Sequence, residues 1–134
     1  LIYSRADATN LEGQLAHRPL QGQSPYLVNI GLYYNGNGFQ ANVLYNVVGK
    51  RIFVTGDQLG NQTIYEMPRH ELDLNLTKSI GKLVEFKMGI TDILNQAFRF
   101  VTDANADAKI DKSDKNWQTF NRGVLVNAGI NFKF

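Results

Sequence analysis

One stretch of the chain places oxygen-bearing groups at the spacing that a bound calcium ion requires. It runs from residue 103 to residue 114, and its candidate ligands are Asp103, Asn105, Asp107, the backbone carbonyl of Lys109, Asp111 and Asp114. Calcium is a hard cation that takes several oxygen ligands, and acidic residues at alternate positions allow one curled loop to converge on it. The chemistry indicated is cation binding that orders a loop.

The spacing resembles the calcium loop of EF-hand proteins, with two departures. The ligands fall at the first, third, fifth, seventh, ninth and twelfth positions of that loop, and the apolar Ile110 falls at the eighth. The sixth position, where a sharp turn favours glycine, is Ala108, and the twelfth is Asp114 instead of Glu. No helix-forming sequence flanks the loop. A solvated acidic outer loop is therefore the simpler interpretation, and a calcium site is the alternative.

Catalytic chemistry finds little support in the sequence. The two histidines, His17 and His70, have no adjacent nucleophile and no metal-ligand spacing. The charged residues of the strands read as a polar wall that pairs across neighbouring strands, not as an acid and base pair; they are Glu71, Asp73, Glu85 and Lys87. We expect no enzyme and no certain cofactor, with Ca²⁺ as the one candidate; a hydrolase barrel using His17 or His70 is a weaker alternative.

Aromatic residues also gather in the long connections of the chain. Trp117, Phe98, Phe100 and Tyr65 could form a surface on which a sugar stacks. Packing of one loop against another explains the same residues more simply, and we prefer that interpretation.

Size and composition limit the classes of protein to consider. The chain has 134 residues, which is about one domain, and a net charge of +2 with no cysteine. No basic run or aromatic and arginine cluster favours nucleic acid as a partner. No apolar run approaches the roughly 20 residues that a membrane helix needs, so a membrane crossing would have to use strands.

Five segments alternate apolar and polar residues with the period of a β-strand. In the last segment one face is entirely apolar, and its residues are Val124, Val126, Ala128, Ile130, Phe132 and Phe134. Each segment is close to the length of about 9–11 residues with which a tilted strand crosses a bilayer. The five segments are Pro25–Tyr34, Phe39–Val47, Arg69–Thr77, Lys82–Thr91 and Arg122–Phe134.

The connections between these segments alternate between short and long. Asn35–Gly38 and Ser79–Gly81 are predicted as tight hairpin turns. The long connections are predicted to be polar and irregular; they are Ala6–Ser24, Gly49–Pro68 and Leu94–Asn121. Transmembrane barrels have this asymmetry. We therefore predict an all-β fold: an antiparallel meander of five to six long strands, part of a transmembrane β-barrel, with the sixth strand truncated at Leu1 to about Arg5. A soluble sandwich or lipocalin-like barrel, with the apolar face as its core, is the alternative.

Three stretches resemble TonB-dependent outer-membrane receptors, among them the SusC-like receptors. Arg18–Asn29, which reads Arg-Pro-Leu-Gln-Gly-Gln-Ser-Pro-Tyr-Leu-Val-Asn, is similar to a segment near the end of these receptors. Gly89–Gln96 resembles the end of their penultimate strand. Phe132 and Phe134 resemble the terminal barrel-assembly signal of outer-membrane proteins.

The resemblance implies that residues 1–134 are the carboxyl-terminal portion of a larger receptor. Such receptors form a barrel of about 22 strands that encloses a plug, and they take up siderophores, vitamins, glycans or peptides with energy relayed by the TonB complex. The plug and the earlier strands are absent from this chain, and its start at Leu1 suggests a processed chain or a fragment. The expected location is the outer membrane of a Gram-negative bacterium.

The partners that the resemblance implies follow from that location. They are outer-membrane lipid, the rest of the receptor's own barrel and plug, the TonB complex through the absent amino-terminal part, and a small-molecule or oligomeric nutrient. A soluble calcium-binding β-sandwich or barrel is the alternative function.

Overall fold

The computed structural model describes residues 5–9, 15–56, 62–105 and 107–132, which form strands and turns without a helix. A search of this part of the chain for a helix able to cross a membrane found none. The strands form antiparallel sheets of two, four and five strands, and the described residues do not close them into a barrel. The predicted all-β antiparallel fold is therefore confirmed. The chain divides into two compact units, each considered by itself.

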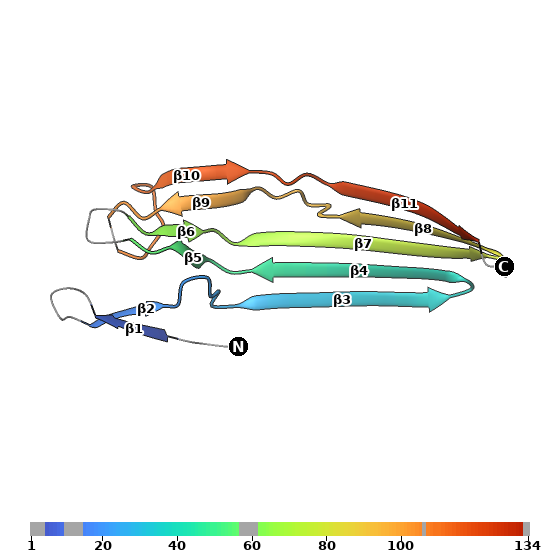
Figure 1. Ribbon diagram of the computed structural model, residues 1–134, viewed down its shortest axis with the longest axis horizontal. Helices are drawn as coiled ribbons and strands as arrows, with labels where there is room; N and C mark the ends of the chain where they lie inside the picture. The colour runs from blue at the N-terminus through green and yellow to red at the C-terminus, as the bar shows by residue number, and fades with distance from the viewer. Residues whose placement is uncertain (1–4, 10–14, 57–61, 106, 133–134) are drawn as a thin grey trace. The chain divides into compact units, whose positions relative to one another are not determined.

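The first unit, called here the five-strand unit, spans residues 28–47, 70–96 and 121–134. Its sheet has the strand order β11-β8-β7-β4-β3 (Figure 1). The five predicted strands are thus observed, with ends shifted by a few residues. Their bounds are β3 Leu27–Gly36, β4 Phe39–Val48, β7 Arg69–Ile80, β8 Val84–Thr91 and β11 Leu125–Phe132. Phe132 is the last residue of β11, and Phe134 lies outside the described residues.

Tight turns join consecutive long strands where the sequence predicts them. Asn37 and Gly38 have φ values of 52° and 68°, so both central residues of the first turn are left-handed, as a tight hairpin requires. The second turn is centred on Gly81, with φ 61°, slightly later than Ser79–Gly81 suggests. Ser79 donates its backbone N–H to the Gly38 carbonyl at 2.8 Å, which ties β7 to the first turn.

The register of β7, β8 and β11 places residues of one kind directly opposite one another. Even-numbered residues pair with even-numbered residues, so each row across the three strands shares one face of the sheet. Three rows are entirely apolar: Leu74–Ile90–Val126, Leu76–Met88–Ala128 and Ile80–Val84–Phe132. The fourth, Lys78–Phe86–Ile130, contains one charge. The odd-numbered rows are Asn75–Gly89–Asn127, Thr77–Lys87–Gly129 and Ser79–Glu85–Asn131.

Gly89 is required by a close approach on the polar face. A Cβ atom at this position would collide with Asn127 Oδ1 and would lie 2.9 Å from Asn75 Oδ1. Glycine therefore allows the two amide side chains to converge above β8.

The second unit, called here the four-strand unit, draws on residues 1–27, 48–69 and 97–120. Its main sheet has the order β10-β9-β6-β5, and β1 pairs with β2 in a separate two-stranded sheet (Figure 1). The bounds are β1 Arg5–Thr9, β2 Leu15–Pro19, β5 Arg51–Val54, β6 Ile64–Glu66, β9 Phe98–Thr102 and β10 Lys115–Phe120. Of the predicted sixth strand, residues 1–4 lie outside the described residues, and β1 begins at Arg5.

These six short strands correct the prediction that the long connections are irregular. The second and third connections carry short runs of β-branched and aromatic residues, such as Ile52, Phe53 and Val54, and these residues favour strands. The runs are brief and lie beside polar turn residues, so no sustained period of two is visible in the sequence. Pairing between different connections, as in β6 with β9, completes the sheet.

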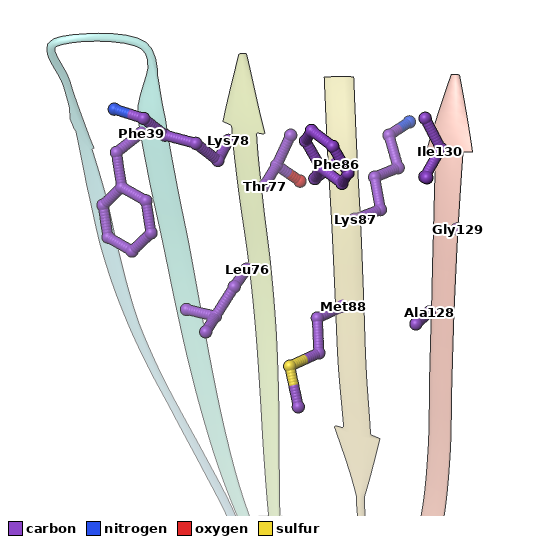
Figure 2. A pocket seen from close by; sticks show the side chains of 10 residues that line it. All are labelled: Phe39, Leu76, Thr77, Lys78, Phe86, Lys87, Met88, Ala128, Gly129 and Ile130. Atoms are coloured by element: carbon purple, nitrogen blue, oxygen red, sulfur yellow. The ribbon is translucent and has the colours of Figure 1, made fainter. Parts of the chain in front are cut away.

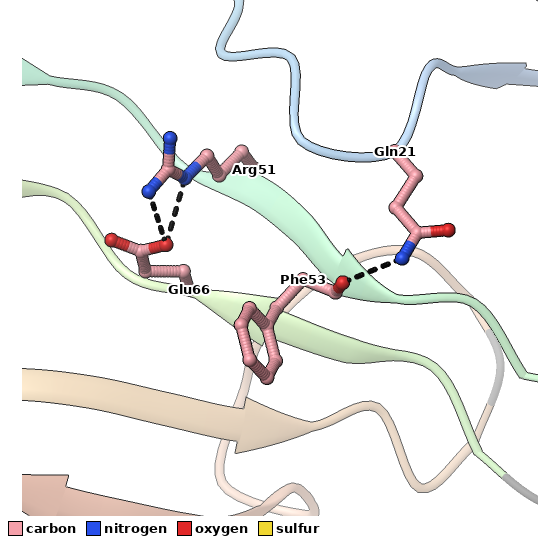
Figure 3. A network of polar contacts seen from close by, with 4 residues as sticks. All are labelled: Gln21, Arg51, Phe53 and Glu66. Atoms are coloured by element: carbon pink, nitrogen blue, oxygen red, sulfur yellow. Dashed lines mark hydrogen bonds and ion pairs between the residues drawn. The ribbon is translucent and has the colours of Figure 1, made fainter.

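The four-strand unit has its own small core and an adjacent ion pair. Ile52, Tyr65 and Val101 lie opposite one another in the register and are all buried. On the other face, Arg51 contacts Glu66 Oε2 through both Nε and Nη2 at 2.7 Å (Figure 3). Gln21 Nε2 donates to the Phe53 carbonyl at 2.8 Å, which ties the segment before β3 to β5 (Figure 3).

We predict that Ile52→Ala destabilises the chain by about 2–5 kcal/mol, because it leaves a cavity in this core. Ile52 is 2% exposed, whereas Val54 in the same strand is 40% exposed. Val54→Ala is therefore the matched control and should cost much less. Urea unfolding followed by the fluorescence of Trp117, the sole tryptophan of the sequence, measures both. Equal losses in the two variants would contradict the assignment of Ile52 to the core.

Candidate functional site

The apolar face of the five-strand unit contains a shallow groove of about 740 Å³. Figure 2 shows that its wall is made by side chains of β7, β8 and β11 and by Phe39 at the start of β4. The long apolar side chains that line it are Phe39, Leu76, Phe86, Met88 and Ile130. The groove carries few polar atoms and no pair of groups suited to acid and base chemistry, so its surface suits an apolar contact.

Large apolar side chains on this face are open to the surroundings. Met88 is 43% exposed and Phe132 is 64% exposed, although both lie in regular strands. Tyr34 and Phe39, whose ring centroids are 6.2 Å apart, add aromatic surface near the first turn. Within the five-strand unit, the described residues therefore do not bury this face as a core.

One charge and one histidine interrupt the apolar face near its ends. Lys78 extends its Nζ to the Asn37 carbonyl at 3.2 Å, in the turn between β3 and β4. The Tyr45 hydroxyl and His70 Nδ1 form a hydrogen bond of 2.6 Å, and the backbone N–H of His70 donates to Gln96 Oε1. His70 therefore has hydrogen-bond partners within the five-strand unit. His17, the other histidine considered for a hydrolase site, lies in β2.

The opposite face carries the charged residues predicted to form a polar wall. Glu71 pairs with Arg122 at 3.0 Å, and Glu85 pairs with Lys87 in the same strand at 3.1 Å. Asp73 Oδ1 accepts the backbone N–H of Asp92, which is completely buried and left-handed with φ 59°. The four predicted residues thus make ion pairs or accept a backbone hydrogen bond. By strand alternation some apolar residues also fall on the side of the polar residues, and they are exposed too: Leu27, Tyr33 and Leu125.

The acidic loop belongs to the four-strand unit and begins directly after β9. Asp103 donates its backbone N–H to the Thr63 carbonyl at 2.9 Å, and its Oδ2 accepts the N–H of Ala108 at 2.9 Å. Asp114 joins the loop's ends, because its Oδ1 accepts the N–H of Ala104 and its Oδ2 accepts that of Asp111. Ala108 has a φ of 62°, so it takes the left-handed conformation that glycine would favour. Asn105 Oδ1 and Asp107 Oδ1 accept the backbone N–H groups two residues later.

Hydrogen bonds also hold one carboxylate of the loop in its ionised form. The side-chain hydroxyl of Ser113 donates to Asp111 Oδ1 at 2.6 Å, and the backbone N–H of Ser113 donates at 2.7 Å. These two bonds lower the pKa of Asp111 below its ordinary value. Among the described residues, no three acidic, histidine or cysteine side chains surround a common point. The predicted ligands are thus brought into one loop but are not drawn together around one centre.

The aromatic residues form a cluster different from the one predicted. Phe100 packs against Phe53, Trp117 and Phe120, with ring centroids 4.7, 6.1 and 6.1 Å away. Phe98 stacks on Phe120 and carries the Arg69 guanidinium on its ring. Tyr65 lies in the register row on the opposite face, where Lys50 Nζ is 4.7 Å from its ring centroid. The register is irregular between Ile52 and Val54 and between Asn116 and Gln118, and irregularities of this kind have no signal in the sequence.

Packing within one sheet explains this cluster, so we predict that Phe100→Ala costs about 3–5 kcal/mol of folding free energy. Phe100 is 7% exposed, and its removal withdraws the central ring of the cluster. Phe53→Ala is the control, since that ring is 42% exposed. The measurement is urea unfolding of each variant. A fully tolerated Phe100→Ala would contradict a structural role and favour a ligand-stacking surface.

The candidate sites of this chain are an exposed apolar sheet face and an acidic loop beside a small aromatic cluster. Comparison with known proteins found no matching family model, no similar curated protein and no similar solved structure.

Proposed function

We propose that this chain supplies the carboxyl-terminal barrel strands of a TonB-dependent outer-membrane receptor that takes up a nutrient such as a siderophore, glycan or peptide. The observation that carries the proposal is the pairing of apolar rows across β7, β8 and β11 on a face that stays exposed. In this role the even-numbered residues of β8 contact lipid tails, and the odd-numbered residues border a wet interior.

Contact of the exposed face with lipid is supported by the free-energy cost of leaving so much apolar surface in water. Apolar surface left in water costs about 25 cal/mol per Å² relative to burial, and soluble monomers seldom expose apolar patches above a few hundred Å². Ile30, Leu32, Phe86, Met88, Val126 and Ile130 are all more than two-fifths exposed. Hydrocarbon tails would remove that cost without a second protein layer.

The charge and the aromatic residues near the first turn fit the edge of a bilayer. Tyr34 and Phe39 lie beside that turn, where an interfacial aromatic belt would be expected. Lys78 reaches the turn backbone, so its charge can leave the apolar region while its methylene chain remains there. The polar rows of the other face would then line the interior.

The edges of the five-stranded sheet call for further strands. Across the described residues, β3 and β11 each pair with only one neighbour. An unpaired strand edge is costly in hydrocarbon, because its N–H and C=O groups lack partners. The remaining strands of the receptor barrel would supply those partners, and the plug would fill its interior.

Scanning β8 with an environment-sensitive fluorophore tests the proposal in the full-length receptor reconstituted in bilayers. Since the sequence has no cysteine, single cysteines at residues 85 to 88 and at 90 can be labelled without background from this chain. Brominated lipid tails should quench the label at 86, 88 and 90 and spare it at 85 and 87. Uniform quenching, or none, would reject lipid contact. A chain that stays folded and monodisperse without detergent would favour the soluble calcium-binding module instead.

Uptake itself is tested in the parent bacterium. Deletion of the gene should abolish growth on one nutrient from a panel of iron-loaded siderophores, glycans and peptides, and deletion of TonB should abolish the same growth. Growth that survives loss of TonB would contradict TonB-dependent uptake but would leave the proposed place of the chain in a barrel untouched.

We predict that Met88→Arg destabilises the receptor in bilayers by about 2–4 kcal/mol, because Met88 would lie near the bilayer centre on the lipid face. Asn127→Arg, on the polar face and one row away, is the matched control and should be tolerated. Unfolding of the receptor by urea in lipid vesicles measures both variants. Similar losses for both would show that the two faces do not differ in surroundings.

A further inference from the structure

We propose that residues 103–114 bind a calcium ion and that the buried carboxylate of Asp103 is its central ligand. This inference does not depend on the proposed receptor function, since a loop of this kind could serve any protein. It rests on the surroundings of one oxygen atom and on the arrangement of the described loop residues, 103–105 and 107–114.

Asp103 Oδ1 is a buried anionic oxygen without a hydrogen-bond partner among the described residues. The residue is 3% exposed, and the other oxygen, Oδ2, accepts the N–H of Ala108 from across the loop. The carboxylate therefore points toward the inside of the loop. A buried charged oxygen without a partner is strongly unfavourable, and a cation inside the loop would compensate it.

Hydrogen bonds place the first and last candidate ligands beside each other. The backbone of Asp103 is anchored on the Thr63 carbonyl, and Asp114 Oδ1 accepts the N–H of Ala104, the next residue along the chain. Gln62 Nε2 donates to the Ala104 carbonyl at 3.2 Å, which holds the same corner from another segment. The two acidic residues at the ends of the loop are therefore held close together before any ion arrives.

The donor set selects the class of ion. All candidate side chains offer oxygen, with Asn105, Asp107, Asp111 and the Lys109 carbonyl completing the set, and the sequence contains no cysteine. Oxygen ligands from carboxylate, amide and carbonyl groups suit a hard divalent cation and disfavour zinc. Calcium accepts a flexible arrangement of six to eight such ligands, whereas magnesium demands a rigid octahedron.

Binding must draw the outer carboxylates inward. Asp107 and Asp111 are exposed, and Lys50 Nζ donates to the Ala108 carbonyl at 3.0 Å. Convergence of these aspartates without a cation is opposed by charge repulsion. We therefore expect calcium both to bind and to order the loop.

Calorimetric titration of the chelator-treated full chain with CaCl₂ tests the inference. We expect saturable binding that magnesium does not reproduce at equal concentration, and a loss of at least tenfold in affinity for Asp103→Asn. Ala108→Gly and Asp114→Glu should tighten binding several-fold, since they relieve the left-handed alanine and supply a second carboxylate oxygen. Glu85→Gln, in the five-strand unit, is the acidic control and should leave the affinity unchanged.

Terbium luminescence gives a second measure of binding. It can be recorded on the wild-type chain, so it does not require that Asp103→Asn folds correctly. Trp117 follows Asp114 by three positions and should sensitise terbium in the loop, and Trp117→Phe should abolish the signal while the calcium affinity stays constant. Calcium should displace terbium from Asp103→Asn at least tenfold less potently than from the wild-type chain, and the exposed variant Asp107→Asn should lose less affinity than Asp103→Asn does. Absence of calcium binding in the wild-type chain, or an Asp103→Asn variant that binds as tightly as the wild-type chain, would overturn the proposal.

Discussion

The register between β7, β8 and β11 is the constraint on which the five-strand unit depends. Val84, Met88 and Ile90 of β8 have apolar neighbours on both sides, as Met88 does between Leu76 and Ala128, and Phe86 has one, since it lies between Lys78 and Ile130. Side chains alternate faces along a strand, so a slip of one residue would mix the two faces completely. The tight turns and the close contact at Gly89 oppose such a slip, because each fits only one alignment. The chemical difference between the two faces therefore follows from backbone pairing.

The four-strand unit relies on a different balance of interactions. Its strands are short, and it has few buried apolar residues. The Arg51–Glu66 ion pair and the packing of aromatic rings around Phe100 also stabilise its sheet. The acidic loop extends from this sheet, anchored where Asp103 meets Thr63. Stability of the sheet and geometry of the loop are thus linked through this backbone hydrogen bond and through those from Gln62 and Lys50 to loop carbonyls.

The sequence predicts the long strands well because their period of two persists over many residues and Asn37-Gly38 marks a turn. It fails for Arg51–Val54 and Ile64–Glu66, since three or four residues are too few to reveal a period. The full aromatic cluster could not be foreseen, because its rings come from β5, β9 and β10, which are separate in the chain and whose pairing has no signal in the sequence. The loop ligands are visible in their spacing, but the hydrogen bond that anchors the Asp103 backbone comes from Thr63, which is distant along the chain, so the burial of Asp103 could not be read from the sequence.

The pairing of β6 with β9 joins two connections that leave the long sheet at different points in the chain. Surface connections usually accept insertions and substitutions independently of one another. Here a change of length in either would disturb a ladder shared with the other. Diversification of this surface would therefore proceed by paired, compensating changes, and grafting one connection alone onto a related scaffold should fail where transfer of both together succeeds.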